Sequence, residues 1–287
     1  MFYTLLDHSS DVATPVMAKP ATAIARWGSA AARLLGLAIV AALGCGSTLA
    51  WADWDVGDPY KMHFPQLPDP NGWDINITGT GNLVADDWQC TQTGPVSDIH
   101  FWYSVQGDDL GTSINSVTAT IYGDIPVSGT VPFSRPGSLL WSGTFGVGAF
   151  QSRFSGTGTQ GFASPQEGTP GWVRPDHIVF NQTNITGIAD PFVQTAGTIY
   201  WLGLSVQVTG TSLIGWKTSL DAFQDDSTFL GTNGLWNELV KPEIFGGQSL
   251  HQAFVITPEP STVALVSIGG LTGAGAFVRR AQRRRRR

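Results

Sequence analysis

The sequence predicts an all-β body: a single antiparallel β-sandwich of jelly-roll type, preceded by an N-terminal signal helix and followed by a C-terminal transmembrane helix. Three observations support this class. β-Branched and aromatic runs recur along the middle of the chain, and connections rich in glycine and proline separate them. No stretch of about 12 residues there keeps the 3.6-residue period of an amphipathic helix. No repeat of fixed length is present, which argues against a propeller or a solenoid.

The first 52 residues have the features of an export signal. Lys19, Arg26 and Arg33 form a basic segment, an apolar segment follows at 34–43, and Ala50-Trp51-Ala52 supplies the small-x-small pattern that signal peptidase recognises. We therefore predict a signal region over 1–52, with cleavage after Ala52 or after Ala50.

Two details of this leader leave alternatives. Asp7 and Asp11 are acidic residues ahead of an otherwise basic leader, so we expect the true start to be Met17. Leu43-Gly44-Cys45 is similar to a lipoprotein processing site, but Ala42 stands three positions before the cysteine, where such sites prefer leucine. Signal peptidase cleavage remains the favoured interpretation.

The predicted strands of the body are short and end at turn residues. Segments 99–105 and 117–122 are β-branched and aromatic, and each is followed by a Gly-Asp turn. Segment 198–208 is the longest strand signal, and its second half alternates as a half-buried antiparallel strand does. Shorter strands are predicted at 139–145, 177–180, 213–218 and 252–257, with glycine- and proline-rich connections at 123–137 and 155–171.

The C-terminus combines a rigid polar motif, an apolar segment and a basic end. Pro258-Glu259-Pro260 precedes the uncharged segment 263–278, and seven arginines follow it. The 16 residues span about 24 Å as a helix, slightly short of the roughly 30 Å hydrocarbon layer. The arginines hold their end on the cytoplasmic side, so this run is a topological stop. An ordinary tail anchor is the simpler alternative.

This arrangement over 258–287 resembles the PEP-CTERM sorting signal of bacterial surface proteins. The resemblance implies an exosortase-type sorting enzyme as a partner, which would read Pro258, Glu259 and Pro260. It also implies export across the inner membrane as an anchored precursor, with delivery to the cell surface or extracellular matrix.

The body between the two signals, 53–257, is strongly acidic. It holds six basic residues against 19 acidic ones, a formal charge of −13. Such a charge repels nucleic acid and anionic membrane surfaces. Cys90 is the only cysteine of the body, so no internal disulfide is available, and we expect Cys90 to be a small buried hydrophobe. About 205 residues suit one domain with its own core.

Nine tryptophans remain in the body, and their surroundings suggest two roles. Trp102 and Trp201 lie in apolar strands and are expected in the core. Trp73 and Trp172 lie among loop residues, where an accessible indole can stack on a sugar ring. We therefore predict Trp73 and Trp172 as the glycan-stacking candidates, with extracellular polysaccharide as the partner.

Acidic pairs are the other chemical candidates of the body. Carboxylates are hard oxygen ligands suited to calcium, although no EF-hand spacing is present. The commoner role of loop aspartates is to cap turns. The predicted calcium ligands, with that alternative left open, are Asp86, Asp87, Asp221, Asp225 and Asp226.

Enzyme signatures are weak. None of the body's four histidines makes a metal-binding spacing, and the Gly-x-Ser-x-Gly elbow is absent. Glycoside hydrolysis needs only two carboxylates across a cleft, and no pair stands out. We expect a non-enzymatic structural or adhesive protein of the envelope or matrix. The alternatives are a carbohydrate-binding module and, third, a glycan-active enzyme.

The body also resembles an uncharacterised family of exported bacterial domains found ahead of the same sorting signal. The resemblance covers most of 60–257 and implies boundaries without a mechanism. The matching segments are 66–74, 85–90, 98–102, 134–137, 200–202, 215–219 and 253–256.

Overall fold

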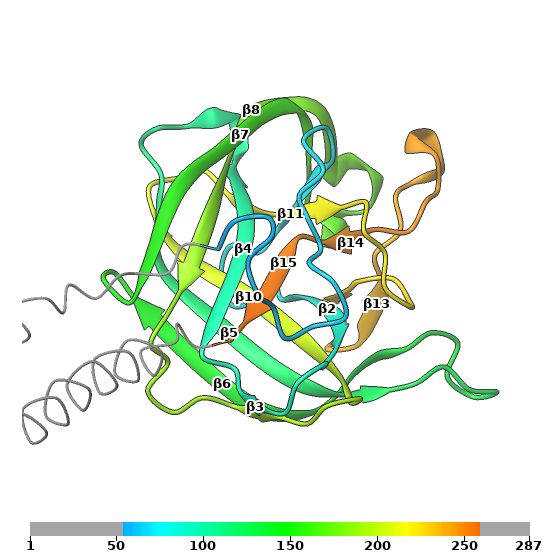
Figure 1. Ribbon diagram of the computed structural model, residues 1–287. Coiled ribbons are helices and arrows are strands. Elements are labelled where there is room, and N and C mark those ends of the chain that lie inside the picture. The colour runs from blue at the N-terminus through cyan, green and yellow to red at the C-terminus, as the bar shows by residue number, and fades with distance from the viewer. Residues whose placement is uncertain (1–53, 259–287) are drawn as a thin grey trace, which may run out of the picture. The chain divides into compact units, whose positions relative to one another are not determined.

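The computed structural model describes residues 54–258, shown in colour in Figure 1. The predicted signal region 1–52, the predicted helix at 263–278, and Glu259 and Pro260 of the predicted sorting motif lie outside the described residues. Within 54–258, no helix has the length and apolar character needed to cross a membrane.

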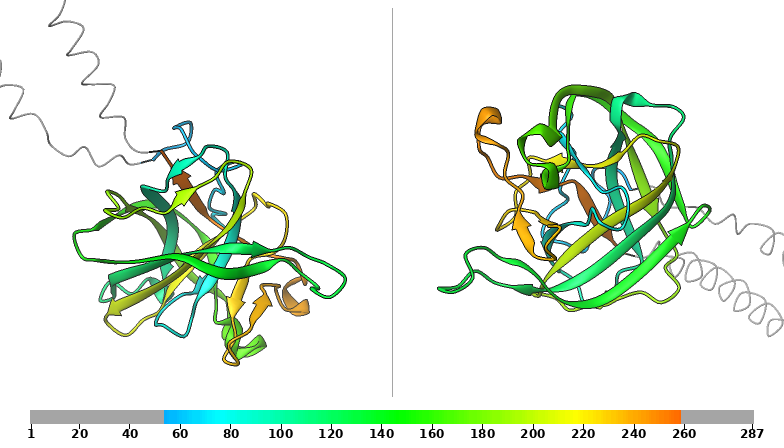
Figure 2. Two further views of the ribbon diagram at one scale, coloured as in Figure 1. Left: turned by 90° about the horizontal axis from the view of Figure 1, so that it is seen from below. Right: turned by 180° about the vertical axis from the view of Figure 1, so that it is seen from behind.

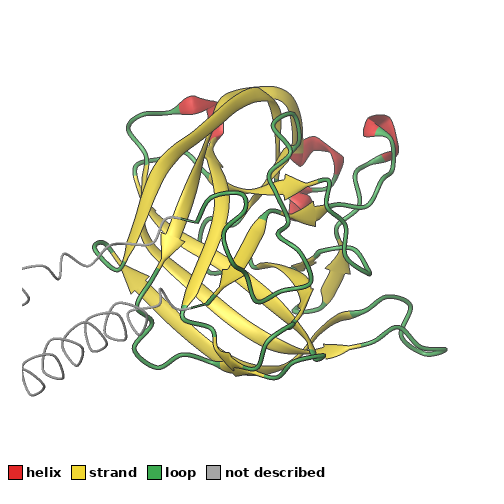
Figure 3. Cartoon of the chain, in the orientation of Figure 1, coloured by secondary structure: helices red, strands yellow, loops and turns green. Residues whose placement is uncertain are grey.

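The described chain is all-β, as predicted, and forms two large sheets and one small one (Figure 3). The seven-stranded sheet contains, in spatial order, β14 (His251–Gln252), β11 (Ile214–Ser219), β1 (Trp73–Asn76), β7 (Phe150–Ala163), β8 (Trp172–Ile185), β4 (Asp98–Val105) and β15 (Phe254–Thr257). The six-stranded sheet contains β13 (Trp236–Glu238), β12 (Thr228–Leu230), β2 (Val84–Gln89), β10 (Ile199–Thr209), β5 (Ser113–Ile125) and β6 (Arg135–Gly146). β3 (Gly94–Pro95) pairs with β9 (Val193–Gln194), and the short 3₁₀ helices are η1 (Gln106–Asp108), η2 (Pro165–Glu167), η3 (Thr169–Gly171) and η4 (Glu243–Phe245).

The predicted jelly-roll sandwich is wrong in its topology, because the first of these sheets closes on itself. β11 pairs with β1 on one side and with β4 on the other, so β11, β1, β7, β8 and β4 form a five-stranded barrel. The β1–β7 pairing is parallel and the other four are antiparallel. Register shifts between β7 and β8 accompany the strong curvature of these two strands in Figure 1.

The glycine-rich segment 155–171 was predicted as a connection, and this is wrong for its first half. Residues up to Ala163 belong to β7, and its glycines serve close packing between neighbouring segments. A Cβ on Gly158 would overlap the Pro70 carbonyl, and one on Gly161 would overlap the Trp73 indole. The β7 glycines therefore allow other segments to approach the strand closely.

The six-stranded sheet packs along one side of the barrel (Figure 2), and one continuous apolar cluster joins the two. Ile75 and Trp216 belong to this cluster from the barrel side, and Val117 and Leu202 from the sheet side. Trp102 and Trp201 are buried, as predicted. Cys90 is likewise a free buried thiol, and burial raises its pKa.

Candidate functional site

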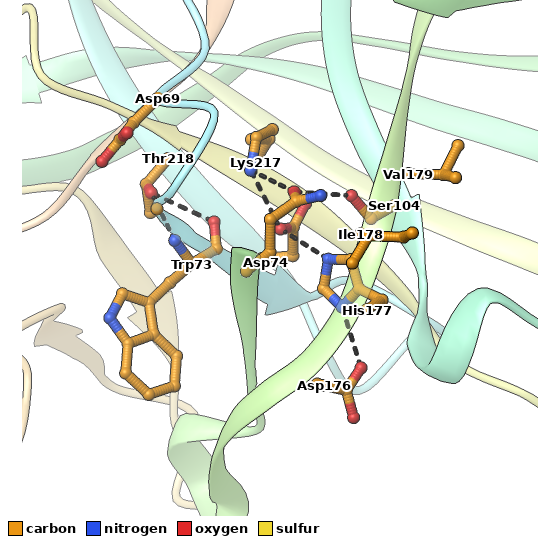
Figure 4. A network of polar contacts seen from close by, with 12 residues as sticks. Asp69, Trp73, Asp74, Ser104, Asp176, His177, Ile178, Val179, Lys217 and Thr218 are labelled. Atoms are coloured by element: carbon orange, nitrogen blue, oxygen red, sulfur yellow. Dashed lines mark hydrogen bonds and ion pairs between the residues drawn. The ribbon is translucent and has the colours of Figure 1, made fainter. Parts of the chain in front are cut away.

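Polar side chains from all five barrel strands meet inside the barrel (Figure 4). Lys217 Nζ donates to Asp74 Oδ2 at 3.3 Å and to Gln160 Oε1. Ser104 Oγ donates to the same Gln160 oxygen at 3.2 Å, and His177 Nε2 lies 3.0 Å from Asp74 Oδ2. Several of these pairs come from strands that are not neighbours, so the side chains must point inward. They belong to β11, β1, β7, β4 and β8 in the order of mention.

The network continues from His177 toward the barrel rim. His177 Nδ1 lies 2.8 Å from Asp176 Oδ2, which also accepts a hydrogen bond from the Gly107 amide at 3.0 Å. Burial acts to lower the pKa of His177, but the hydrogen bonds and charges of Asp74 and Asp176 outweigh it and raise the pKa. Burial lowers the pKa of Lys217, with Asp74 opposing the shift. Two carboxylates therefore favour a protonated imidazole between them.

This network is sealed from solvent. The side chains of Asp74, His177 and Lys217 are 0% exposed. A Cβ on Gly215 would overlap Asp74, so the glycine lets the strands close over the ion pair. A general acid or base must come within hydrogen-bonding reach of its substrate, and these groups contact one another instead. The arrangement is suited to fixing which barrel strands pair and in what register.

Asp86 and Asp87 are adjacent in β2 and therefore project to opposite faces of the sheet. The Asp86 carboxylate accepts hydrogen bonds from Gln66 Nε2 at 2.8 Å and from the Gln252 amide at 2.6 Å. Both carboxylate oxygens of Asp87 lack a hydrogen-bond partner among the described residues. Burial raises the pKa of Asp86 to about 8 and that of Asp87 to about 10, and neighbouring carboxylates add to both shifts.

The five predicted calcium ligands do not form one metal-binding group, although the charge of Asp226 acts on Asp86 and that of Asp225 acts on Asp87. Asp221 accepts a hydrogen bond from the Leu67 amide at 3.0 Å, and Asp225 accepts from the Ser134 amide and hydroxyl at 2.8 and 3.0 Å. Over 54–258, no group of three or more His, Cys, Asp or Glu residues is placed to hold a metal ion. Calcium binding stays a prediction that needs an experiment.

Trp73 and Trp172 are brought together, but in a closed arrangement. Trp73 is 3% exposed and Trp172 is 7% exposed, so the expectation that these rings are accessible is wrong. Their rings pack edge to face at 5.0 Å, and Phe245 lies 4.9 Å from Trp73. The Arg174 guanidinium stands 5.7 Å from the Trp73 ring centroid. Their role in glycan stacking stays a prediction, and sequence missed the pairing because each tryptophan begins a strand beside loop residues.

A pocket of about 240 Å³ opens beside Trp73. Arg174 fixes one wall, because its Nη2 donates to the carbonyls of Asn71 at 2.7 Å and Thr159 at 3.0 Å. Lys241 lies on the wall too and is half-buried. The residues that give the pocket its chemistry are Asp69, Asn71, Trp73, Arg174, Lys241 and Gln248.

Sequence reasoning named Trp73 and missed the charged groups of both sites. Lys217 carried a usable signal, because it is a lysine flanked by Trp216 and Thr218 in a predicted strand of a body with few basic residues. Arg174 and Lys241 carried only that scarcity as a signal. They converge because the fold brings strand β8, which contains Arg174, close to the segment that contains Lys241.

A family model described as a domain of unknown function, DUF7901, matches residues 62–257. The match covers more than half of the chain, and the chain belongs to this family. A search of curated proteins finds no match.

Proposed function

We propose that this chain is an exported, non-enzymatic structural or adhesive protein of the cell surface or extracellular matrix, sorted by a PEP-CTERM/exosortase-type system. The observation that carries the proposal is the order of Pro258-Glu259-Pro260, the apolar segment 263–278 and the terminal arginines. A soluble enzyme of the cytoplasm does not require an apolar segment with a basic end, whereas a sorted and anchored surface protein requires the motif, the apolar segment and the arginines.

The extent of the family match supports this proposal. The match runs from 62 to 257, between the predicted leader cleavage after Ala52 and Glu259 of the sorting motif. The family domain therefore includes neither predicted signal.

A non-enzymatic role is favoured by how the ionisable groups of the body are used. Asp74, His177 and Lys217 contact one another in a sealed interior. The Asp86 carboxylate accepts hydrogen bonds from protein donors. These groups serve the fold, and a surface scaffold needs a robust fold more than a reactive cleft.

The sorting step is tested by Glu259→Ala in the full chain, expressed in a host with the sorting enzyme. We expect the variant to stay in the inner membrane with its tail intact, because the enzyme loses the side chain at the centre of its motif. Cell fractionation and the intact mass measure this. Ser261→Ala is the matched control and should be delivered normally. Normal delivery of the Glu259 variant contradicts the proposal.

A second candidate function, carbohydrate binding, is favoured by the pocket beside Trp73. Its lining combines amide and carboxylate groups, which can hydrogen-bond sugar hydroxyls, with the edge of a buried tryptophan. A glycan array on the full chain in detergent separates this candidate from a purely structural role. Binding of any matrix glycan supports it, and an empty array leaves the structural role.

A further inference from the structure

The pocket beside Trp73 collects positive charge in an otherwise acidic body. Residues 53–257 contain six basic side chains against 19 acidic ones, and Arg174 and Lys241 both line this pocket. Asp69 is the one acidic side chain in its lining. The local balance of charge is therefore positive, opposite in sign to that of the whole body.

The other four basic side chains have roles elsewhere in the described structure. Lys217 is buried in the barrel, and Lys61 Nζ donates to the Pro95 carbonyl at 3.0 Å. Arg153 pairs with Asp55 at 2.7 Å, and Arg135 lies over the Phe133 ring at 5.6 Å. Lys241 forms no ion pair or side-chain hydrogen bond within residues 54–258, which leaves its ammonium group available to a ligand.

The remaining lining groups suit hydroxyl recognition. Asp69 Oδ1 accepts a hydrogen bond from the Asn71 backbone amide at 2.9 Å, and the side-chain oxygen of Asn71 accepts one from the Thr159 amide at 3.1 Å. Each keeps a second polar atom for a ligand, and Gln248 adds an exposed amide. The volume of about 240 Å³ is below the roughly 300–1,000 Å³ typical of drug-sized ligands, so a single sugar unit is the appropriate size.

We propose that this pocket binds a uronic-acid unit of an acidic polysaccharide, with its carboxylate on Lys241 and Arg174 and its hydroxyls on Asp69, Asn71 and Gln248. The proposal rests on the matrix location proposed above and names the ligand class of the carbohydrate-binding candidate. Arg174 has five N–H groups, of which its carbonyl contacts occupy only part. Trp73 contributes wall contact, in place of the open stacking platform expected from the sequence.

The test is calorimetric titration of the full chain in detergent with oligogalacturonate and with its methyl-esterified form. The parent should bind the acid form more tightly than the ester. Lys241→Ala should weaken binding of the acid about 10- to 100-fold, because a charge-assisted hydrogen bond is lost. Affinity for the ester should change little. Arg135→Ala removes the same charge at a residue outside the pocket lining and should retain parent affinity.

Three results would overturn the proposal: equal affinity of the parent for acid and ester, parent-like binding by Lys241→Ala, or an equal loss in Arg135→Ala. Lys241→Gln, which keeps length and polarity, guards against misfolding and should show the same loss. Because titration does not depend on delivery, failure here leaves the sorting proposal intact. Failure of delivery in cells likewise leaves the affinity result standing.

Discussion

Asp87 is the side chain whose replacement should stabilise the protein. It is fully buried, its oxygens lack partners among the described residues, and Asp86, Asp124 and Asp225 place further negative charge nearby. Burial raises its pKa to about 10 from an ordinary value of 3.8. The native state therefore holds a proton on Asp87 at neutral pH, whereas the unfolded chain releases it.

The cost follows from proton linkage. Each pH unit between the unfolded pKa and the ambient pH costs about 1.4 kcal/mol, so holding this proton at pH 7 costs about 4 kcal/mol. The native state binds more protons than the unfolded state in this window, so stability falls as pH rises from about 4 toward about 10. Asp86, with a pKa raised to about 8, acts in the same direction. The Asp87→Asn side chain does not ionise, so this variant should avoid most of the loss of unfolding free energy as the pH rises.

Denaturant unfolding of the full chain in detergent, repeated between pH 4 and pH 8, measures this difference. Asp87→Asn should match the parent near pH 4 and exceed it by a few kcal/mol near pH 8. Asp190→Asn removes an exposed carboxylate and should follow the parent throughout. Parallel pH profiles for Asp87→Asn and the parent would refute the reasoning. If the parent alone gains melting temperature from calcium over EDTA, Asp87 holds a cation instead of a proton.

Two further predictions concern folding. Lys217→Met should cost about 3–5 kcal/mol of unfolding free energy, because it leaves the Asp74 charge buried without its ammonium partner. Lys241→Met, at a half-buried site outside the barrel network, is the control. An equal small effect for both variants would contradict the barrel network. Trp73→Ala and Trp201→Ala should each cost about 3–5 kcal/mol through lost burial and a cavity. A melting temperature unchanged by Trp73→Ala would show that the ring is not part of the core.

Local sequence predicted the strands better than their partners. The β-branched runs at 99–105 and 117–122 lie within β4 and β5, and the run at 198–208 lies within β10 except for its first residue, because residue preference and alternation are local properties. Barrel closure depends on β11 pairing with both β1 and β4, two segments distant in sequence. No alternation pattern records which partner a strand selects.

The candidate site was predicted only in part for a similar reason. Trp73 was singled out for its loop neighbours, yet Gly161 of β7 and Phe245 pack against it. Asp74 and Lys217 are directly paired across β1 and β11, a register that neither segment specifies alone. The charged groups of the pocket and the barrel could therefore be recognised only from the tertiary fold.

The start and end of the body are hydrogen-bonded to each other, and this determines what a tether would display. The Lys61 amide donates to the Ile256 carbonyl at 2.8 Å, so the leader-side and tail-side ends of the body leave from neighbouring positions. The segment 241–249, the orange loop at the right of Figure 1, lies on the far side of the body from these ends in both Figure 1 and Figure 2. An anchor attached after Pro258 would hold the body by this end, so the Lys241 loop on the opposite side would face the surrounding polymer.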